Sequence, residues 1–447
     1  MTSLASDFYW SGDKLPDETE DKFKSWYQQN SSLAKEDFFN FVNKEWIKRN
    51  PIPDDYRRWS AFNILAEDNK KKVKELLLSD YNESDQFNKV RVLYLKGMDT
   101  ETRNLKNPSE IGKSYFDEIN SSQTTKELFE KSINLFLLNG FSGPFNFSVY
   151  ADMENSDFNI MHFFSSGLGM PDRDYYLEDD KQKERDEYNK FVNRLIDYSE
   201  LNINHSNIFS IETELAKAMR SRVEKRDPHK RNNTTKINQL NQNYPNLPWQ
   251  FLFNQIKKEP GKINLSNPDY FKRLNELVDQ YNLDSWKDYF SWRLLLNIAS
   301  YSTIEAEKNL FDFYGNVLSG TPKMKPLEKR VLNMLDDNVG EIIGKKYAER
   351  YFPAESKKLA EKMVEFIKNE LERRVIGLDW MSADTKVQAL EKLNKFGVKI
   401  GYPDKWRDFT KLNISMDKSL FDNVLAVNRF EIQDDIDQLY KPVDKSR

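Results

Sequence analysis

Residues 356–377 read SKKLAEKMVEFIKNELERRVIG, and this stretch carries the clearest structural signal in the chain. Apolar side chains recur here every four residues, which places them on one face of an α-helix. The repeating residues are Leu359, Met363, Ile367, Leu371 and Val375. Ser356 is a candidate N-cap and Gly377 a candidate stop. The stretch therefore predicts a long helix with one apolar face.

Helical periodicity continues along most of the chain. Near the N-terminus one helix face carries Phe38, Phe39, Phe41, Val42, Trp46 and Ile47. Pro51 and Pro53 end that helix, and we expect its aromatic residues to lie in a core. Further helices are expected at 211–223, at 271–281, at 286–301 and after a cap at Ser382, where Val387, Leu390 and Leu393 follow.

One region departs from the helical pattern. Phe145, Phe147 and Val149 alternate with polar residues, as do Phe158, Ile160 and His162, and a polar segment separates the two runs. This alternation predicts a β-hairpin with a long turn, followed by a glycine-rich loop at 166–171. The expected fold class is mainly α, a large multi-helix lobe with a small β-hairpin.

Composition restricts the function. The chain has 447 residues, a length typical of about three domains. Its net charge is −4, so it lacks the basic balance of a nucleic-acid-binding protein, and we expect no nucleic-acid partner. Aromatic residues make up 13% of the chain, which excludes a disordered protein.

Catalytic and metal-binding motifs are missing. The chain has no cysteine, and its three histidines, His162, His205 and His229, form no His-Glu-x-x-His zinc motif. No phosphate-binding loop, dinucleotide motif or serine nucleophile elbow occurs. Glu431 and Asp435 match a Glu-x-x-x-Asp spacing, but without a histidine pair this is a chance match. We expect no catalytic residue, no metal ligand and no cofactor in this chain.

The sequence also carries no recognisable targeting signal. Residues 1–10 lack the basic and apolar regions of a signal peptide. The longest apolar stretches, 133–138 and 294–299, are far shorter than a membrane span. We therefore expect a soluble chain in the cytoplasm or elsewhere inside the cell, with no membrane span.

Several blocks together resemble a known family. Residues 37–46 read DFFNFVNKEW, residues 50–53 read NPIP, and residues 166–177 read SGLGMPDRDYYL. In this order they resemble the N-terminal portion of neprilysin and the endothelin-converting enzymes, which are zinc metallopeptidases. Further blocks that match in order are Leu93-Tyr94 with Met98-Asp99, Ile211-Glu212 with Leu215-Ala216 and Arg226-Asp227-Pro228, Phe313-Tyr314 with Leu318-Ser319-Gly320-Thr321, and Tyr351-Phe352-Pro353.

The resemblance implies a helical lobe that covers the active-site face of a thermolysin-like catalytic lobe. It implies an N-terminal extension at 1–35, the helical lobe at 36–400, and at 401–447 a connection toward a catalytic lobe that is absent. The family's zinc ligands and general base lie in that C-terminal portion. This chain alone is therefore expected to be catalytically incomplete.

One substrate-binding position carries over from the family. Arg58 matches an arginine that binds the C-terminal carboxylate of short peptides, and a guanidinium suits a carboxylate through paired hydrogen bonds. An aspartate of the same family segment is Asn63 here, which removes one negative charge. The candidate substrate-binding residues are thus Arg58 and Asn63, and the expected ligands are short peptides. The competing interpretation of Arg58 is an exposed arginine without a ligand.

Other charged and polar residues have simple structural interpretations. His162 alternates with Phe158 and Ile160, so we interpret it as a strand residue rather than a metal ligand. Basic residues gather between Arg220 and Arg231, but Glu224 and Asp227 interleave with them, which favours a solvated segment with ion pairs.

Two functions remain open. In the first, the chain is the substrate-gating lobe of a split or truncated peptidase, completed by a separate catalytic lobe. In the second, it is a non-enzymatic peptide-binding or scaffold protein derived from such a peptidase. A relic without selected activity is a third interpretation. An exposed apolar face where a catalytic lobe would sit favours the first.

Overall fold

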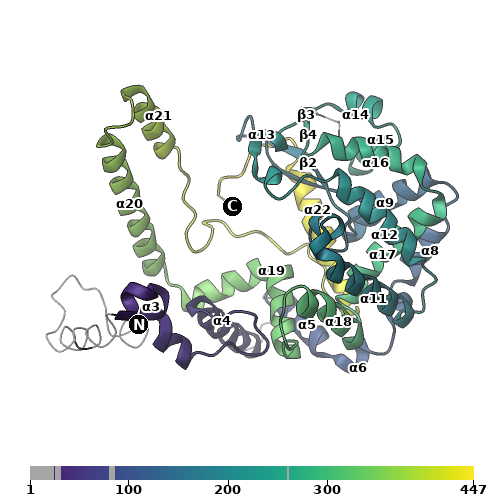
Figure 1. The fold of residues 1–447 in the computed structure, drawn as a ribbon, viewed down its shortest axis with the longest axis horizontal. Coiled ribbons are helices and arrows are strands. Elements are labelled where there is room, and N and C mark those ends of the chain that lie inside the picture. Colours follow the sequence, from purple (N-terminus) through teal and green to yellow (C-terminus); the bar gives the residue numbers. More distant parts are fainter. Residues whose placement is uncertain (1–24, 26–31, 80–85, 259–260, 447) are drawn as a thin grey trace. The chain divides into compact units, whose positions relative to one another are not determined.

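The computed structural model describes residues 25, 32–79, 86–258 and 261–446, and most of these residues are helical. Contacts within the chain divide it into two compact units. Unit 1 comprises Met1–Asn69 with Ser319–Met324, and unit 2 comprises Lys70–Leu318 with Lys325–Arg447. Figure 1 labels the elements along the chain. Most of the expected extension at 1–35 lies outside the described residues.

Unit 1 contains α3 (Phe38–Arg49) and the first half of α4 (Ala61–Leu78). Asp37 begins α3 by accepting a hydrogen bond from the backbone N–H of Asn40 at 2.9 Å, and the helix ends before Pro51 as predicted. The expectation that its aromatic face lies in a core is correct for Phe41 but wrong for Phe38 and Phe39. Both are about two-thirds exposed, because the described residues of unit 1 provide few elements to cover the helix.

Unit 2 holds the remaining elements. In its first part these are α5 (Asn88–Met98), α6 (Thr100–Arg103), α7 (Pro108–Ile111), α8 (Lys113–Asn120), α9 (Thr125–Asn139), β1 (Phe145–Ala151), β2 (Asn159–Ser165), α10 (Asp174–Leu177), η1 (Asp179–Lys181), α11 (Gln182–Tyr198), α12 (His205–Ala218), η2 (Glu224–Arg226), α13 (Pro228–Arg231) and β3 (Thr234–Thr235). There follow α14 (Ile237–Asn243), α15 (Trp249–Ile256), β4 (Ile263–Leu265), α16 (Pro268–Gln280), α17 (Leu283–Ala299), α18 (Ile304–Leu310), the π-helix η3 (Phe311–Val317), α19 (Leu327–Tyr351), α20 (Ala354–Ile376), α21 (Ala383–Asn394) and α22 (Leu420–Gln438).

The predicted hairpin is confirmed and belongs to a larger sheet. β1 and β2 pair antiparallel with Phe145 opposite Ser165. β4 lies parallel to β2, with Met161 opposite Ile263, and β3 completes the order β1-β2-β4-β3. β3 and β4 have two and three residues, too few to show a period of two in the sequence. The fold is mainly helical with one small mixed sheet.

The larger core of unit 2 surrounds α17. This helix buries apolar residues on all sides, which is typical of a helix enclosed by other elements. Trp286 and Trp292 are fully buried, and Phe129 of α9 packs edge-on against Trp286 with ring centroids 4.9 Å apart. Such edge-on aromatic pairs add to the free energy gained by burying the rings. α17 contacts α7, α8, α9 and α12, so it organises the part of the unit that carries the sheet.

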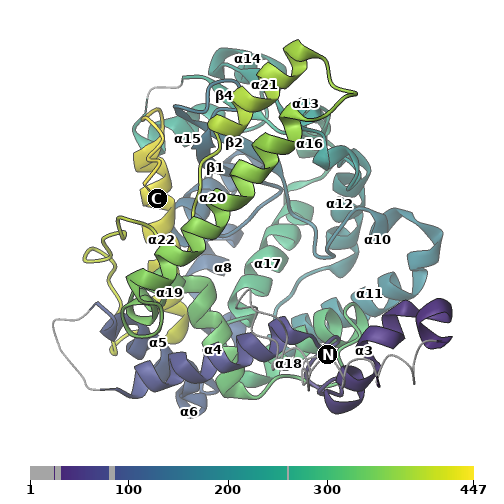
Figure 2. The same ribbon diagram turned by 90° about the vertical axis from the view of Figure 1, so that its left-hand side faces the viewer.

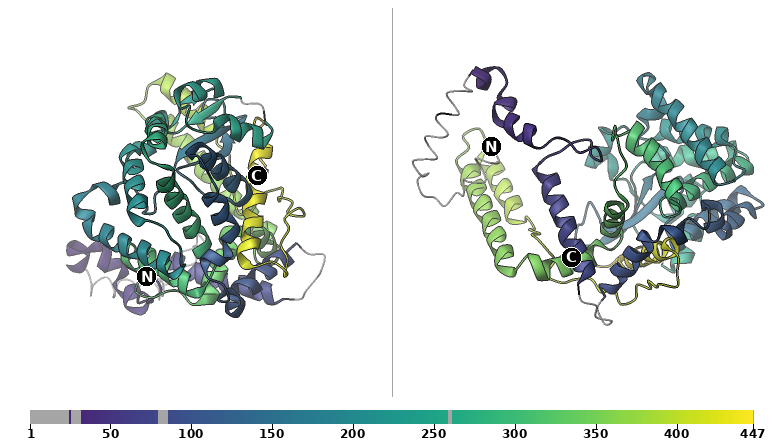
Figure 3. Two further views of the ribbon diagram at one scale, coloured as in Figure 1. Left: turned by 90° about the vertical axis from the view of Figure 1, so that its right-hand side faces the viewer. Right: turned by 90° about the horizontal axis from the view of Figure 1, so that it is seen from below.

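A smaller core cluster joins α5, α19 and α22, with Leu93, Leu335 and Val424 buried in it. The segment 401–447, in which the sequence shows little periodicity, therefore contains a 19-residue helix that belongs to the core. α22 also packs on α9 and β1 (Figure 3, α22 in yellow). The buried residues of α22 surround the helix because it is covered from more than one side, which conceals the period of 3.6. Whether a catalytic lobe follows stays a prediction.

The stretch 356–377 forms the predicted helix, with one correction. α20 begins directly after Pro353, so Ser356 lies inside its first turn and is not the N-cap, since proline fixes the backbone angle that starts a helix. The expected stop at Gly377 is correct. The expected cap at Ser382 is also confirmed, because its hydroxyl accepts a hydrogen bond from the N–H of Thr385. α20 and α21 contact each other and run side by side (Figure 2).

Candidate functional site

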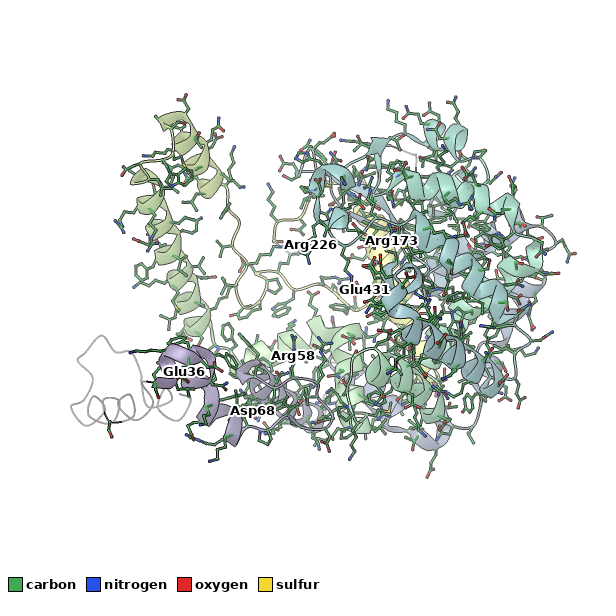
Figure 4. The ribbon with its side chains drawn as sticks, in the orientation of Figure 1. Glu36, Arg58, Asp68, Arg173, Arg226 and Glu431 are labelled. Atoms are coloured by element: carbon green, nitrogen blue, oxygen red, sulfur yellow. The ribbon has the colours of Figure 1, made fainter. Side chains whose placement is uncertain are left out.

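Arg58 lies in unit 1, on the segment between α3 and α4 (Figure 4). The segment is held in place next to it. Tyr56 donates a hydrogen bond to Glu67 of α4, its ring packs edge-on against Trp59, and the N–H of Lys323 donates to the carbonyl oxygen of Asp54 at 3.0 Å. Arg58 itself is exposed, and within the described part of the chain no hydrogen bond or ion pair engages its guanidinium. The structure thus presents a solvent-facing cation on an anchored backbone.

Asn63 occupies the first turn of α4, five residues beyond Arg58. Its side-chain oxygen accepts a hydrogen bond from the hydroxyl of Ser60 at 2.8 Å, and its N–H donates to the carbonyl oxygen of Ser60 at 3.0 Å. These contacts make Asn63 part of the helix start. Among the described residues, no contact joins it to Arg58. Substrate binding by this pair stays a prediction.

The loop Ser166–Pro171 is held by hydrogen bonds to its carbonyl oxygens from α16, from α17 and from η3. The donors are Tyr270 to Ser166 at 2.9 Å, Tyr289 to Gly167 at 2.9 Å, Arg293 to Leu168 at 2.8 Å and Tyr314 to Gly169 at 2.7 Å. Gly167 has φ +94°, a left-handed conformation that favours glycine. The donors fix the loop backbone at four successive residues, and these contacts hold the loop in one conformation.

Glu212 of α12 lies next to this loop and is fully buried. One carboxylate oxygen, Oε2, accepts hydrogen bonds from the hydroxyls of Tyr176 at 2.7 Å and Tyr188 at 2.8 Å. The Tyr176 hydroxyl in turn accepts from the N–H groups of Gly169 and Met170. The other oxygen, Oε1, has no hydrogen-bond partner among the described residues.

Burial dominates the electrostatics of Glu212. Removing the carboxyl from water raises its pKa from 4.5 to about 7, while the nearby Arg293 and the two tyrosine hydroxyls oppose this rise. No functional role for Glu212 is predicted from the sequence. A signal was present, because Glu212 lies among Ile208, Ile211 and Leu215 on the buried face of its helix. A single acid on such a face indicates a buried hydrogen-bonded group.

His162 lies in β2, as the alternation predicts, and its side chain is fully buried. Its ring stacks on Tyr150 with centroids 3.6 Å apart, and Nδ1 accepts a hydrogen bond from the side-chain amide of Asn264 at 3.1 Å. Burial lowers the pKa of His162, which favours the neutral imidazole that this geometry requires. Across the described residues, no cluster of three or more His, Asp or Glu side chains could hold a metal ion.

Three of the basic residues between Arg220 and Arg231 form ion pairs within unit 2, namely Arg222, Lys225 and Lys230. Nε of Arg222 lies 3.1 Å from Oδ2 of Asp172, and Nζ of Lys230 lies 3.0 Å from Oε1 of Glu224. Arg220 donates to the carbonyl oxygen of Ser266 at 2.6 Å. Figure 4 labels Arg226 in this segment and Arg173 close to it. These contacts order the end of α12 and the turn after it, so the cluster is an ion-paired surface segment.

α20 carries an exposed apolar surface, and none of its residues is buried. The α20 stripe consists of Leu359, Met363, Phe366, Ile367 and Leu371. Its members are between 43% and 66% exposed, and four of them belong to the apolar face that the sequence pattern predicts. α21 packs along a different side of α20, where Val364, Lys368 and Leu393 line a common groove. Contiguous exposed apolar residues on a helix mark an interaction surface.

Comparisons with known proteins agree with this description. Two solved structures share this fold. The Mycobacterium tuberculosis zinc metalloprotease Zmp1, solved with an inhibitor, matches with a TM-score of 0.85 and 26% identity, over 92% of this chain and 64% of that protein. PepO from Lactobacillus rhamnosis shares the fold, with a TM-score of 0.83 and 20% identity, over 92% of this chain and 66% of that protein.

Sequence comparison then gives the family. The family model described as Peptidase family M13 matches residues 34–403, and this chain belongs to that family. Endothelin-converting enzyme 1 of Cavia porcellus is 27% identical, over 83% of this chain and 51% of the relative. Neprilysin of Mus musculus is 26% identical, over 92% of this chain and 60% of the relative. The chain thus spans little more than half the length of these relatives.

None of the helices in the described ranges combines the length and apolar character needed to cross a bilayer.

Proposed function

We propose that this chain is the substrate-gating lobe of a family M13 zinc peptidase and acts together with a catalytic portion that supplies the zinc. The observation that carries the proposal is the exposed α20 stripe, five apolar residues on one face of a 23-residue helix. Covering such a stripe removes apolar surface from water, which is the main driving force of association. The relatives extend well beyond the matched region. A catalytic portion that corresponds to their additional chain would cover the α20 stripe.

The experiment isolates the chain from its native source, measures its intact mass, and identifies what purifies with it. We expect a mass above 53.0 kDa, or a tightly bound polypeptide that carries His-Glu-x-x-His and zinc and hydrolyses peptides. Zinc is measured by elemental analysis and peptidase activity with a fluorogenic peptide. A chain of 53.0 kDa that purifies alone would contradict the proposal.

A matched pair of variants tests the α20 stripe. Ile367→Glu places a charge in the centre of the stripe, and because Ile367 is 66% exposed the change leaves the chain's own packing intact. We expect at least a tenfold loss of affinity for the catalytic polypeptide, since burying an unpaired charge costs several kcal/mol. Val223→Glu is the control, because Val223 is 78% exposed and lies outside α20. Equal binding by both variants would place the interface elsewhere.

We further propose that Arg58 binds the C-terminal carboxylate of peptides, with the Ser60–Asn63 pair fixing the backbone beside it. The support is an exposed guanidinium without a protein partner among the described residues, on a segment held by Tyr56 and Lys323. Hydrogen bonds between charged groups contribute about 1.5–3 kcal/mol, so a free carboxylate should bind roughly 10 to 100 times more tightly than the corresponding amide.

The same measurement separates the two candidate functions. Peptides with a free or an amidated C-terminus are titrated into the wild-type chain, into Arg58→Gln and into the neighbouring control Arg57→Gln, with and without the catalytic polypeptide. Preference for the free carboxylate that is lost only in Arg58→Gln supports the assigned role. Preference that requires the catalytic polypeptide favours the gating lobe. Full preference in the isolated chain favours a peptide-binding scaffold, and a preference unchanged in Arg58→Gln would refute the role.

A further inference from the structure

A pocket lies in unit 2, where α5, α6 and α7 meet the end of α17 and the start of α22. It is a pocket of about 190 Å³, here called the α5–α22 pocket. Its apolar lining is formed by Leu105, Ile111, Tyr301, Leu420 and Phe421. Leu420 and Phe421 are buried and belong to the two core clusters of the unit, so this wall is rigid. Leu105 is 76% exposed and forms the open edge.

The volume limits the size of a ligand. A dry cavity of about 150 Å³ in a protein core is sufficient to bind benzene. The α5–α22 pocket is slightly larger, so it has room for one ring or a branched chain of similar size. Binding pockets combine such an apolar lining with a few polar groups that fix the orientation of the ligand.

The charged residues of the pocket are mainly basic. Lys96, Arg103 and Lys106 line it together with a single acid, Asp99. Arg103 is buried, and its guanidinium already has partners within the protein. It donates hydrogen bonds to the carbonyl oxygens of Gly97 and Ser302 and forms an ion pair with Glu307.

The remaining charges leave an excess of positive charge. Asp99 accepts a hydrogen bond from the N–H of Thr102 at 3.1 Å. The side chain of Thr102 and this N–H together hold the pKa of Asp99 below its usual value, and Lys96 adds to the effect. Lys106 is exposed, and no hydrogen bond or ion pair engages it within the described ranges. An anionic group at the rim would therefore be attracted, while its apolar part fills the pocket.

We propose that the α5–α22 pocket binds a small carboxylate that carries one ring-sized apolar group. Apolar contacts with Leu420 and Phe421 select the ring, and the lysine ammonium groups select the carboxylate. Such a molecule arises as a free aromatic or branched-chain acid, or as the C-terminal residue of a peptide. Both sources share the chemistry of an apolar group a few bonds from a carboxylate. The proposal does not depend on the gating function or on Arg58.

The experiment titrates 3-phenylpropionate into the full chain and follows binding by ligand-observed NMR. Three further probes separate the requirements. 3-Phenylpropan-1-ol keeps the ring without the charge, propionate keeps the charge without the ring, and N-acetylphenylalanine represents a peptide C-terminus. We expect saturable binding of 3-phenylpropionate with a dissociation constant on the order of 1 mM, as suits so small a ligand, and at least fivefold weaker binding of the alcohol and of propionate.

Two pairs of variants locate the site. Thr102→Phe introduces a bulky side chain at a lining position, with the adjacent exposed Glu101→Phe as control. Lys106→Gln removes one charge, with the exposed Lys126→Gln of α9 as control. We expect Thr102→Phe to weaken binding at least tenfold and Lys106→Gln about threefold to tenfold, with both controls unchanged. Intrinsic tryptophan fluorescence verifies that each variant is folded.

Each outcome has a consequence. Tighter binding of N-acetylphenylalanine than of 3-phenylpropionate identifies peptide C-termini as the source, and the reverse order identifies free acids. Equal binding of propionate, or equal binding of the alcohol, would overturn the proposed ligand class. Binding that survives both Thr102→Phe and Lys106→Gln would place the ligand at another site, and absence of saturable binding up to about 10 mM would overturn the pocket itself.

Discussion

Replacing Glu212 by glutamine tests the electrostatics of the loop Ser166–Pro171. The glutamine side chain has nearly the same shape as a protonated glutamate. Its carbonyl oxygen can accept the hydrogen bonds that Tyr176 and Tyr188 donate to Oε2. The change therefore removes a titratable group from a fully buried position while retaining the contacts that hold the loop. Any effect that depends on pH then reports the proton of Glu212.

The size of the effect follows from the pKa of Glu212. Folding raises this pKa from 4.5 to about 7, because burial disfavours the ionised form. Between these two values the folded chain holds a proton that the unfolded chain has released. The free energy of unfolding is thus highest below pH 4.5 and falls as the pH rises to 7. At about 1.4 kcal/mol per pH unit, the total loss is about 3 kcal/mol.

The assay compares urea unfolding of wild type and Glu212→Gln at several pH values from about 5 to 8, followed by the fluorescence of the buried residues Trp249, Trp286 and Trp292. We expect the stability of wild type relative to the variant to decrease by about 2–3 kcal/mol across this range. Glu214→Gln on the same helix is the control. Ion pairs with Lys217 and Arg273 lower the pKa of Glu214, so its contribution is lost only at lower pH. A difference that stays constant with pH would show that Glu212 is ionised in the folded chain across this range and that its pKa is not raised by burial.

Three further predictions concern the loop Ser166–Pro171, the hydrogen bonds of Tyr188 and the α20 stripe. Gly169→Ala should destabilise the chain by about 2–3 kcal/mol in urea unfolding, because the added Cβ would lie 1.8 Å from the Tyr188 hydroxyl, whereas Gly397→Ala, with no atom within 4 Å, should be nearly neutral. Tyr188→Phe should lower the free energy of unfolding by about 1–3 kcal/mol. The change removes one hydrogen-bond donor from Glu212 and leaves the buried Trp292 Nε1 without its acceptor at 3.1 Å. A decrease below about 0.5 kcal/mol would contradict this account. Ile367→Glu should lower the binding of the fluorescent apolar dye ANS by the isolated chain, while Val223→Glu should leave it nearly unchanged.

The amphipathic helices could be predicted because apolar side chains recur at helical spacing along one of their faces. The period of four residues in 356–377 and the proline stop after α3 are visible without any tertiary information. In α17 and α22 this signal weakens, because neighbours cover them on several sides and select apolar residues all around. β3 and β4 are invisible for a different reason. Their two and three residues are strands only because the hairpin provides an edge with which to pair.

The candidate site was only partly predictable. Arg58 could be selected because it stands in a recognisable block, and the structure adds that its guanidinium faces solvent. Glu212 was not selected, because its surroundings come from α10, α11 and α17, far away in sequence. The exposure of Phe38 and Phe39 could not be predicted either. A periodic pattern shows which face of a helix is apolar, but not whether anything covers that face.

The position of α22 also has a consequence for synthesis on the ribosome. The side chain of Asn428 donates a hydrogen bond to the backbone of Asn139 at 3.0 Å, across 289 residues of sequence. At typical elongation rates of 5–20 residues per second, α9 and β1 emerge about 15–60 s before the helix that covers them. During that interval their apolar side chains have no native cover on this side. The nascent chain therefore offers a binding site for chaperones that closes only when α22 has been made.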